Sequence, residues 1–469
     1  MRYVLVGLLF ALMIGAGLAS AGEYPNGYTH RPIMELFTST SCGPCMNYAD
    51  PAIAELWETE GDTPEQPWVF IAFHQSSGGA LDDKFVTDES KERAEHYLVQ
   101  ATPTAEFDGG YIEVIGGGED TKDEYDQDFD DSGNRDDEIF SATDFKEVTM
   151  YIHQEFDGDG FMVNVSVEYP IDLDDKMPTL DGTLEVFMVE DDIWAYSSAL
   201  DEVVLLHNVF RGYAIKDMDV QLNQGDSATF IGRWDIPHDV EVPVDPLNVF
   251  AVAVLYDDDD TSSEREADGN HHAQSPRAVQ CTTPRATLYD LGEEGPIIGV
   301  PEITWNGRAW DIEVYLNDDD NMSSAWIFYT TNYTENSTDV IEWQWAEMTL
   351  PSECHGPVCD IASSGIAKVE IELGRTEAFY FRIVAYDGNK TASISDIMNS
   401  VDYASSSRAT RAERRRCPSI RPCSSSPWPS RSSSSPEGAA GNDGPGPPRP
   451  LLPRSDHCPL MDEWPTTCC

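Results

Sequence analysis

The sequence predicts a multidomain chain in which an α/β domain is followed by two antiparallel β-sandwich domains. Three observations lead to this fold class. Within residues 28–115, apolar runs typical of buried strands alternate with stretches of helical spacing. Within 146–290, and again within 296–403, apolar and polar residues alternate with period two between turns rich in Asp and Gly. The total of 469 residues is long enough for several hydrophobic cores.

Residues 1–21 have the features of a secretory signal peptide. Arg2 supplies a positive start, an apolar stretch follows, and Ala19, Ser20 and Ala21 form a small-residue cleavage site. The apolar stretch is about 15 residues long, which is short for a membrane span. We therefore expect an exported protein, secreted or exposed at the cell surface, in a compartment that permits disulfides. A retained N-terminal anchor is the alternative.

The first domain combines two strands with two helices. Continuous apolar runs predict buried strands at 32–38 and 68–74. Helical spacing predicts helices at 46–58 and 88–99. The second of these helices begins at Asp88, a residue type that is favoured at N-caps.

An acid-rich linker is predicted at 116–145, ahead of the two β-sandwich domains. Part of it imitates a calcium-binding loop, but the closing bidentate ligand is missing, so we interpret the acids as a solvated linker. In the first sandwich the predicted strands are 148–153, 161–169, 182–189, 227–234 and 247–256. In the second sandwich they are 302–305, 310–316, 325–331, 367–373 and 378–387.

The final segment, 404–469, differs in composition from the rest of the chain. It contains nine Arg, no Lys and six acids together with 12 Pro and 13 Ser, so its net charge is about +3, against about −59 for residues 1–403. A frameshifted or misassembled C-terminus would produce such a change; a disordered basic tail is the alternative. No fold is predicted for this segment.

The formal net charge of −56 restricts the class of partner. A surface this negative argues against nucleic acid as a partner, because a protein binds the phosphates through its Lys and Arg side chains. The acids are spread along most of the chain. This distribution favours a salt-adapted, halophilic protein over one that collects divalent cations.

A Cys-x-x-Cys motif carries the chemistry that the sequence suggests. It consists of Cys42, Gly43, Pro44 and Cys45, and it lies between the first predicted strand and the first predicted helix. At a helix N-terminus the dipole and the unpaired amides stabilise a thiolate, so Cys42 is the expected nucleophile and Cys45 the resolving thiol. The alternatives are a purely structural disulfide and half of a zinc site, for which two further ligands would be needed.

The motif and its surroundings resemble the thioredoxin fold. The motif opens a helix after a strand, and Thr102, Pro103 and Thr104 follow the second predicted helix. In thioredoxins a cis proline at the corresponding place faces the two cysteines and helps to bind the substrate backbone. The resemblance therefore implies this role for Pro103, with Thr102, Gly43 and Pro44 beside it in the substrate groove.

Two residues are candidates for proton transfer. Glu35 lies on the strand where thioredoxins carry a buried catalytic acid. His74, at the end of the second predicted strand, is a candidate proton carrier, and a solvated strand-end histidine is the alternative. Ser41 occupies the place where thioredoxins usually carry Trp.

The later segments resemble two other families. Residues 184–192, 207–211 and 249–256 are similar to the Omp28-related exported proteins, which join a thioredoxin-like domain to a β-sandwich. The sequence AFYFRIVAYD at 378–387 looks like a late strand of a fibronectin type III domain. That resemblance implies a spacer or adhesion module without chemistry of its own.

Three cysteines lie outside the motif and the C-terminal segment. Cys354 and Cys359 are predicted to form a disulfide that closes a short loop, with a metal site as the alternative. Cys281 is left without a predicted partner. The acidic turns, and the pair His271 and His272, do not specify a metal cage, so neither a metal nor another cofactor is predicted.

The predicted function is thiol–disulfide exchange on protein substrates outside the cytoplasm. Cys42 and Cys45 would carry the reaction, and an unidentified redox partner would restore the pair. The alternative is a cell-surface binding or adhesion protein, in which the disulfide is static and the sandwich domains present the binding surface.

Overall fold

The computed structural model describes most of the chain between residues 28 and 403. The described residues are 28–76, 83–134, 147–171, 178–238, 240–259, 276–318, 321–334, 341–355, 358–361, 363–374, 378–388, 392–401 and 403. The predicted signal peptide and the segment 404–469 lie outside them. None of the helices in the described part of the chain is both long enough and apolar enough to cross a membrane.

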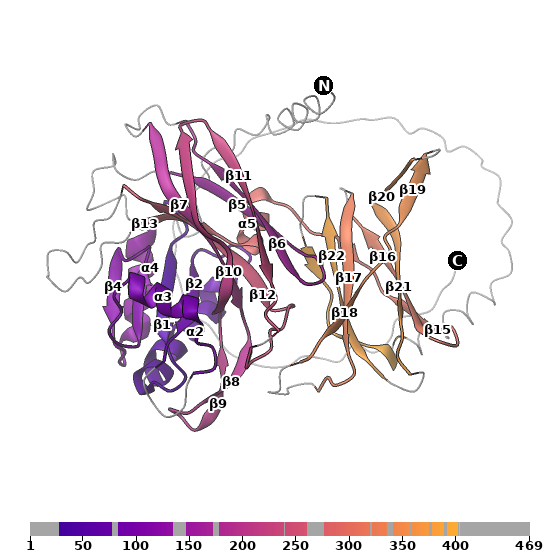
Figure 1. The fold of residues 1–469 in the computed structure, drawn as a ribbon, viewed down its shortest axis with the longest axis horizontal. Helices are drawn as coiled ribbons and strands as arrows, with labels where there is room; N and C mark the ends of the chain where they lie inside the picture. Colours follow the sequence, from indigo (N-terminus) through magenta and orange to yellow (C-terminus); the bar gives the residue numbers. More distant parts are fainter. Residues whose placement is uncertain are drawn as a thin grey trace, which may run out of the picture. The chain divides into compact units, whose positions relative to one another are not determined.

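An eight-stranded mixed sheet forms the centre of the part of the chain between Ile33 and Thr282 (Figure 1). Its strand order is β13-β12-β7-β10-β2-β1-β3-β4. The strands in chain order are β1 (Ile33–Thr38), β2 (Val69–His74), β3 (Thr104–Phe107), β4 (Ile112–Ile115), β7 (Thr179–Glu190), β10 (Val209–Asn223), β12 (Val249–Asp257) and β13 (Arg277–Thr282).

This sheet crosses the boundary predicted between the first two domains. Strands β1 to β4 come from 28–115 and the other four come from 146–290. At the junction, Val209 of β10 lies opposite Ala72 of β2 in a parallel pair, and the N–H of Ala72 donates to the carbonyl oxygen of Asn208 at 2.9 Å. The predicted division therefore does not separate two sheets, because pairing between distant strands leaves no trace in local apolar patterns.

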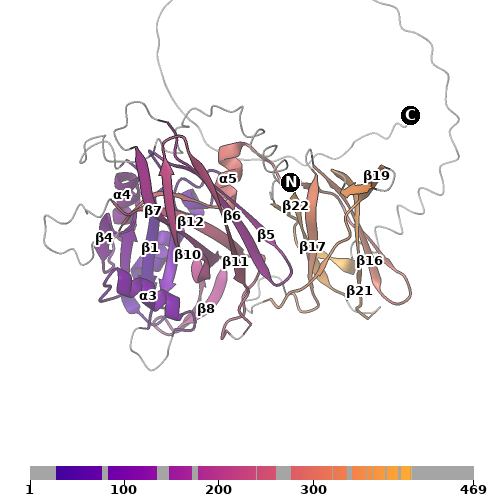
Figure 2. The same ribbon diagram turned by 45° about the horizontal axis from the view of Figure 1, so that its top comes forward.

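Helices cover both faces of the β1 to β4 half of the sheet. The described residues contain α2 (Asp50–Leu56), α3 (Asp88–His96), α4 (Thr121–Gly133) and α5 (Pro284–Leu291), and π-helical turns η2 (Cys45–Ala49) and η3 (Trp57–Gly61) extend α2 at both ends. Buried residues of α2 and α4 share one core with β1, β2 and β3, whereas α3 contributes to a second core with β7 and β12 (Figures 1 and 2).

Helix α3 begins at Asp88, so its N-cap lies one residue before the predicted one. Its N-cap is Thr87, whose hydroxyl accepts from the N–H of Ser90 at 2.9 Å, while the N–H of Thr87 donates to the hydroxyl of Ser90 at 3.0 Å. This reciprocal pair is a capping box and satisfies two amides at once. Asp88 lies in the first turn, where its charge suits the helix dipole.

Helix α4 occupies much of the predicted acidic linker at 116–145. Tyr125 and Phe129, four residues apart, are both buried, and the ring of Phe129 stacks on that of Trp68 at 4.2 Å between centroids. The acids lie mostly on the other side of the helix. The described residues that imitate a calcium-binding loop are therefore part of a helix, so they do not form such a loop.

A three-stranded sheet covers the β7, β10 and β12 half of the large sheet. It contains β5 (Thr149–Phe156), β6 (Gly160–Glu168) and β11 (Ser227–Asp235) in the order β11-β6-β5. Along β6, buried Val163, Val165 and Val167 alternate with half-buried residues, as the period-two pattern predicts. These valines share a core with Val186 of β7 and Ala251 of β12.

The last part of the described chain is all β. One sheet contains β14 (Ile297–Ile298), β15 (Glu302–Trp305), β16 (Trp310–Asn317) and β21 (Ser364–Ile371), and the other contains β17 (Met322–Thr330), β18 (Gln344–Glu347), β22 (Tyr380–Asp387), β23 (Ala392–Ile394) and β24 (Met398–Asn399). Ile312 and Ile327, from different sheets, share one buried core. The broad prediction of an α/β part followed by β sheets is thereby confirmed.

Candidate functional site

The Cys42–Cys45 pair forms a disulfide where β1 leads into the helix of η2, α2 and η3. The two Cα atoms are 5.3 Å apart. Pro44 has helical backbone angles and is exposed, and Gly43 faces open space, since a Cβ there would meet no atom within 4 Å. The N–H of Cys42 donates to the carbonyl oxygen of Ser39 at 3.0 Å, which fixes the turn before the helix.

The two sulfur atoms have different surroundings. Cys42 keeps 8% of its surface exposed and Cys45 none, so a substrate can approach only Cys42. The backbone N–H of Cys45 donates to the Sγ of Cys42 at 3.2 Å. In the reduced pair this amide, together with the helix dipole, would stabilise a thiolate at Cys42.

The Thr102–Pro103 segment lies against the disulfide. The Sγ of Cys42 is 3.4 Å from the carbonyl oxygen of Thr102, and the peptide bond between Thr102 and Pro103 is cis. Pro103 is buried, and β3 begins at the next residue. The structure thus brings together the two cysteines and the Thr-Pro pair that the sequence singled out. Their roles in substrate binding stay predictions.

Asp50 is a carboxyl group close to the motif in the chain. It starts α2, its N–H donates to the carbonyl oxygen of Cys45, and its carboxylate accepts from the hydroxyl of Thr38 at 2.5 Å. Burial raises the pKa of Asp50 to about 6, because the hydrogen bond from Thr38 only partly offsets the loss of water. This group was not among the predicted site residues.

His74 is buried at the end of β2, so the interpretation as a solvated strand-end histidine is wrong. Its Nδ1 lies 2.9 Å from a carboxylate oxygen of Asp83, which also accepts from the N–H and the hydroxyl of Thr40. Burial lowers the pKa of His74, but the charge and hydrogen bond of Asp83 outweigh burial and raise it above the usual value. Nε2 of His74 has no hydrogen-bond partner among the described residues.

Glu35, the other predicted acid, belongs to a different cluster. Arg93 of α3 donates to Glu35 at 2.5 and 2.8 Å and to Glu185 of β7 at 2.8 Å, and all three side chains are buried. Burial would raise the pKa of Glu35, but the guanidinium of Arg93 holds it below the usual value. The pKa of Glu35 is thus lowered and that of Asp50 is raised, so Asp50 is the carboxyl near the motif that titrates closer to neutrality.

A hairpin from the second segment covers the disulfide. It consists of β8 (Ile193–Ser197) and β9 (Glu202–Leu206), and both ends contribute to a small apolar core with Cys42 and Cys45. Two further contacts hold its tip: the hydroxyl of Ser197 and the N–H of Ala199 both donate to the carbonyl oxygen of Thr40, at 2.9 and 3.3 Å. Sequence reasoning missed this hairpin, because its outward face is as apolar as its inward face.

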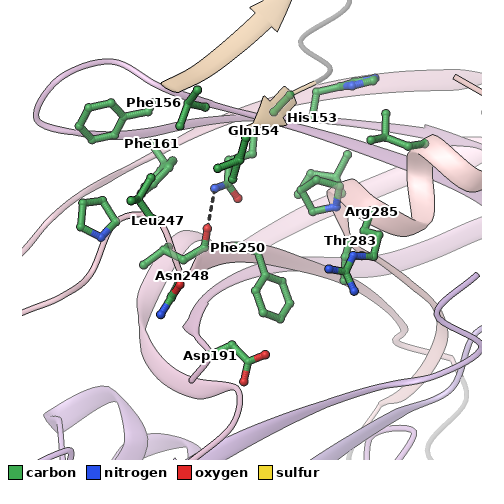
Figure 3. A pocket seen from close by; sticks show the side chains of 18 of the residues that line it. His153, Gln154, Phe156, Phe161, Asp191, Leu247, Asn248, Phe250, Thr283 and Arg285 are labelled. Atoms are coloured by element: carbon green, nitrogen blue, oxygen red, sulfur yellow. Dashed lines mark hydrogen bonds between the residues drawn. The ribbon is translucent and has the colours of Figure 1, made fainter. Parts of the chain in front are cut away.

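A cavity of about 440 Å³ lies away from the cysteines (Figure 3). Leu247 and Phe250 line it at the start of β12 and Asp191 lines it after β7, while Gln154 of β5 donates to the carbonyl oxygen of Val249 at 3.0 Å. Its lining is chiefly apolar and contains neither cysteine of the motif. It therefore does not serve as the groove for an exchanging disulfide.

The other predicted cysteine sites have separate positions. Strands β19 (Ser352–His355) and β20 (Val358–Ile361) form a hairpin whose backbone pairing places Cys354 opposite Cys359. The disulfide between them stays a prediction. Cys281 is a buried free thiol in β13, and burial raises its pKa. The pair at 271 and 272 lies outside the described residues.

The chain has little detectable similarity to known proteins. No family model matches the chain, and no curated protein matches it. Among solved structures, the chain is similar to HBP35 of Porphyromonas gingivalis with a TM-score of 0.41 and 12% identity, over 79% of this chain and 98% of that chain. No inference about function follows from a similarity of this size.

Proposed function

We propose that this chain is an exported thiol–disulfide oxidoreductase that acts on protein substrates through Cys42 and Cys45. The observation that carries the proposal is the N–H of Cys45, which donates to the Sγ of Cys42 at 3.2 Å at the start of a helix. A donor in this place favours a thiolate at the more exposed of the two sulfurs. A purely structural disulfide does not need a hydrogen-bond donor beside its more exposed sulfur.

The different exposure of Cys42 and Cys45 sets the order of steps in the exchange reaction. In the reducing direction, the Cys42 thiolate attacks one sulfur of a substrate disulfide, forms a mixed disulfide and expels the other sulfur as a thiolate. The Cys45 thiol then loses its proton and attacks the Sγ of Cys42. The substrate leaves with two thiols, and the Cys42–Cys45 disulfide has formed. A redox partner must return two electrons to this pair before the next turnover.

Proton transfer from Cys45 needs an ionised acceptor whose pKa is nearer to neutrality than that of an ordinary carboxyl. Asp50, with a pKa of about 6 and a hydroxyl donor from Thr38, meets this requirement. Glu35 does not, because Arg93 holds its pKa below the usual value. We infer that Asp50 is the proton acceptor and that the pair of His74 and Asp83 tunes the local charge.

Three resemblances complete the proposal. The part around the motif is thioredoxin-like, with Pro103 shaping the substrate groove. The joining of this part to β7, β10 and β12 in one sheet supports an Omp28-related architecture. The two sheets at 297–399 support a fibronectin type III-like spacer that presents the redox part outside the cell.

The test is a glutathione redox titration of the full chain in high salt. Alkylation and mass analysis of the peptide that carries Cys42 and Cys45 separate this pair from the other cysteines. We expect a reversible transition between about −120 and −270 mV. A pair that stays oxidised below about −300 mV would mean a structural disulfide and would favour the adhesion function instead.

Matched single variants test the direction of attack. Cys45→Ser should accumulate mixed disulfides with a protein substrate such as insulin, because Cys42 attacks but cannot be released. Cys42→Ser should accumulate none, since Cys45 is fully buried. Equal trapping by the two variants would contradict the assigned roles.

A further inference from the structure

We propose that Asp191, Asp192 and His207 form a divalent-cation site that crosslinks the two ends of the β8–β9 hairpin. Asp191 and Asp192 connect β7 to β8, and His207 directly follows β9. The candidate ligand atoms of these three side chains all lie within 4.8 Å of one another. This inference is independent of the redox proposal.

The distances around His207 fit an ion between its Nδ1 and the two carboxylates. Nδ1 lies 2.7 Å from Oδ1 of Asp191 and 3.6 Å from Oδ1 of Asp192. Ligand atoms of a tetrahedral zinc site, with bonds of about 2.0–2.1 Å, are roughly 3.3 Å apart. Small movements of the side chains would therefore replace the present hydrogen bond with coordination.

Supporting groups are present around these ligands. Nε2 of His207 lies 3.9 Å from Oε1 of Glu58, and a small movement of Glu58 would let it accept a hydrogen bond that orients the ring. The second carboxylate oxygen of Asp191, Oδ2, accepts from the indole N–H of Trp57 at 3.3 Å. An imidazole nitrogen that is combined with carboxylate oxygens suits zinc and similar divalent metals better than calcium.

Two observations distinguish this cluster from a solvated acidic turn. First, the side chain of His207 is only 7% exposed, and in the described ion pairs it is the basic partner of all three carboxylates, Asp191, Asp192 and Glu58. Second, the neighbouring Asn208 is completely buried, its N–H donates to Asp191, and neither polar atom of its side chain has a hydrogen-bond partner among the described residues. Buried polar atoms without a partner in the protein are commonly satisfied by an ion or an ordered water.

The position of the site gives it a structural consequence. The hairpin covers the disulfide of Cys42 and Cys45, and its two ends meet where the ion would bind. An ion held by both ends would restrict the hairpin in its present place. Zinc loading should therefore slow local opening of the hairpin.

The experiment uses the full chain in its oxidised form, freed of metal with a chelator and dialysed against zinc in high salt. We expect one tightly bound zinc ion per chain and at least tenfold weaker binding by Asp192→Asn, a variant of a side chain that is 62% exposed. Glu202→Gln is the matched control, because it removes one exposed charge from the far end of the same hairpin. It should bind zinc like the wild type.

Two further readouts complete the test. Cobalt bound in place of zinc should give a spectrum without thiolate charge transfer, since the ligands are nitrogen and oxygen. Zinc should also slow hydrogen exchange in the hairpin of the wild type but not of Asp192→Asn. Equal zinc binding by wild type and Asp192→Asn would overturn the site, and unchanged hairpin exchange would overturn the crosslink.

Discussion

At the scale of single residues, the partner of a buried carboxyl decides whether it is structural or reactive. Glu35 and Asp50 are both acids within the α/β part of the chain. Glu35 faces the guanidinium of Arg93, so its pKa is lowered even though burial opposes this. Asp50 has no guanidinium beside it, and the hydroxyl of Thr38 and the charge of His74 only partly offset burial, so its pKa rises to about 6. We therefore propose a structural role for Glu35 and a role in proton transfer for Asp50.

The raised pKa of Asp50 predicts a pH-dependent effect of Asp50→Asn. A carboxyl whose pKa is higher in the folded than in the unfolded chain destabilises the fold as it ionises, here between pH 3.8 and about 6. The neutral amide avoids this cost. Relative to the wild type, the free energy of unfolding of Asp50→Asn should therefore increase by about 1 kcal/mol between pH 5 and pH 7.5. Urea unfolding at the two pH values measures it.

Asp123→Asn is the control for this prediction. Asp123 is an exposed acid in the first turn of α4, so its replacement removes the same charge without changing a buried group. Its effect on the unfolding free energy should be nearly equal at both pH values. A parallel response of the two variants would show that the effect of Asp50 is only that of net charge.

At the scale of elements, α3 is held to the sheet by charge more than by apolar contact. Its sequence DESKERAEH offers little apolar surface, and Ala94 is its one buried apolar side chain. Arg93 compensates by donating to Glu35 of β1 and Glu185 of β7, and to the hydroxyl of Tyr256 of β12 at 2.6 Å. One side chain thus connects α3 to strands from both halves of the eight-stranded sheet.

Replacing Arg93 with Met should destabilise the protein by about 3–5 kcal/mol, because two buried carboxylates lose their cation. Lys91→Met is the matched control on the same helix, since Lys91 makes only an exposed pair with Asp88. Its effect should stay below about 1 kcal/mol. Chemical unfolding of the two variants gives the comparison, and similar losses would contradict the central role of Arg93.

The elements also show where sequence patterns succeed and fail. Strands in which apolar and polar residues alternate, such as β6 and β16, are predictable because one face is buried and the other is more exposed to solvent. Helix α4 was missed because the many acids around Tyr125 and Phe129 conceal their four-residue spacing. In the site, the cysteines and Pro103 were predictable from a local motif. Asp50, the hairpin over the disulfide and the cluster at His207 depend on contacts between distant segments.

At the scale of the whole molecule, the net charge of −56 must be compatible with a folded chain whose largest sheet has eight strands. Like charges on a compact surface repel one another, and mobile ions reduce this repulsion over distances beyond the Debye length of about 10 Å at 0.1 M salt and about 3 Å at 1 M. The described surface ion pairs use only a small share of the 85 acids. The 29 Lys and Arg are too few to pair with most of the 85 acids, so we propose that mobile ions of dissolved salt screen the remaining acids.

We therefore expect the stability of the full chain to rise with ionic strength. Between about 0.1 and 2 M NaCl at neutral pH, the unfolding temperature should increase by about 5 °C or more, equivalent to roughly 2 kcal/mol. Sucrose at matched water activity is the control, because it strengthens burial without screening charge. Thermal unfolding followed by circular dichroism in the two series separates the effects. A flat response to NaCl with a rise in sucrose alone would mean that the acids are spaced widely enough to need no screening, and adaptation to salt would then be the wrong explanation of the composition.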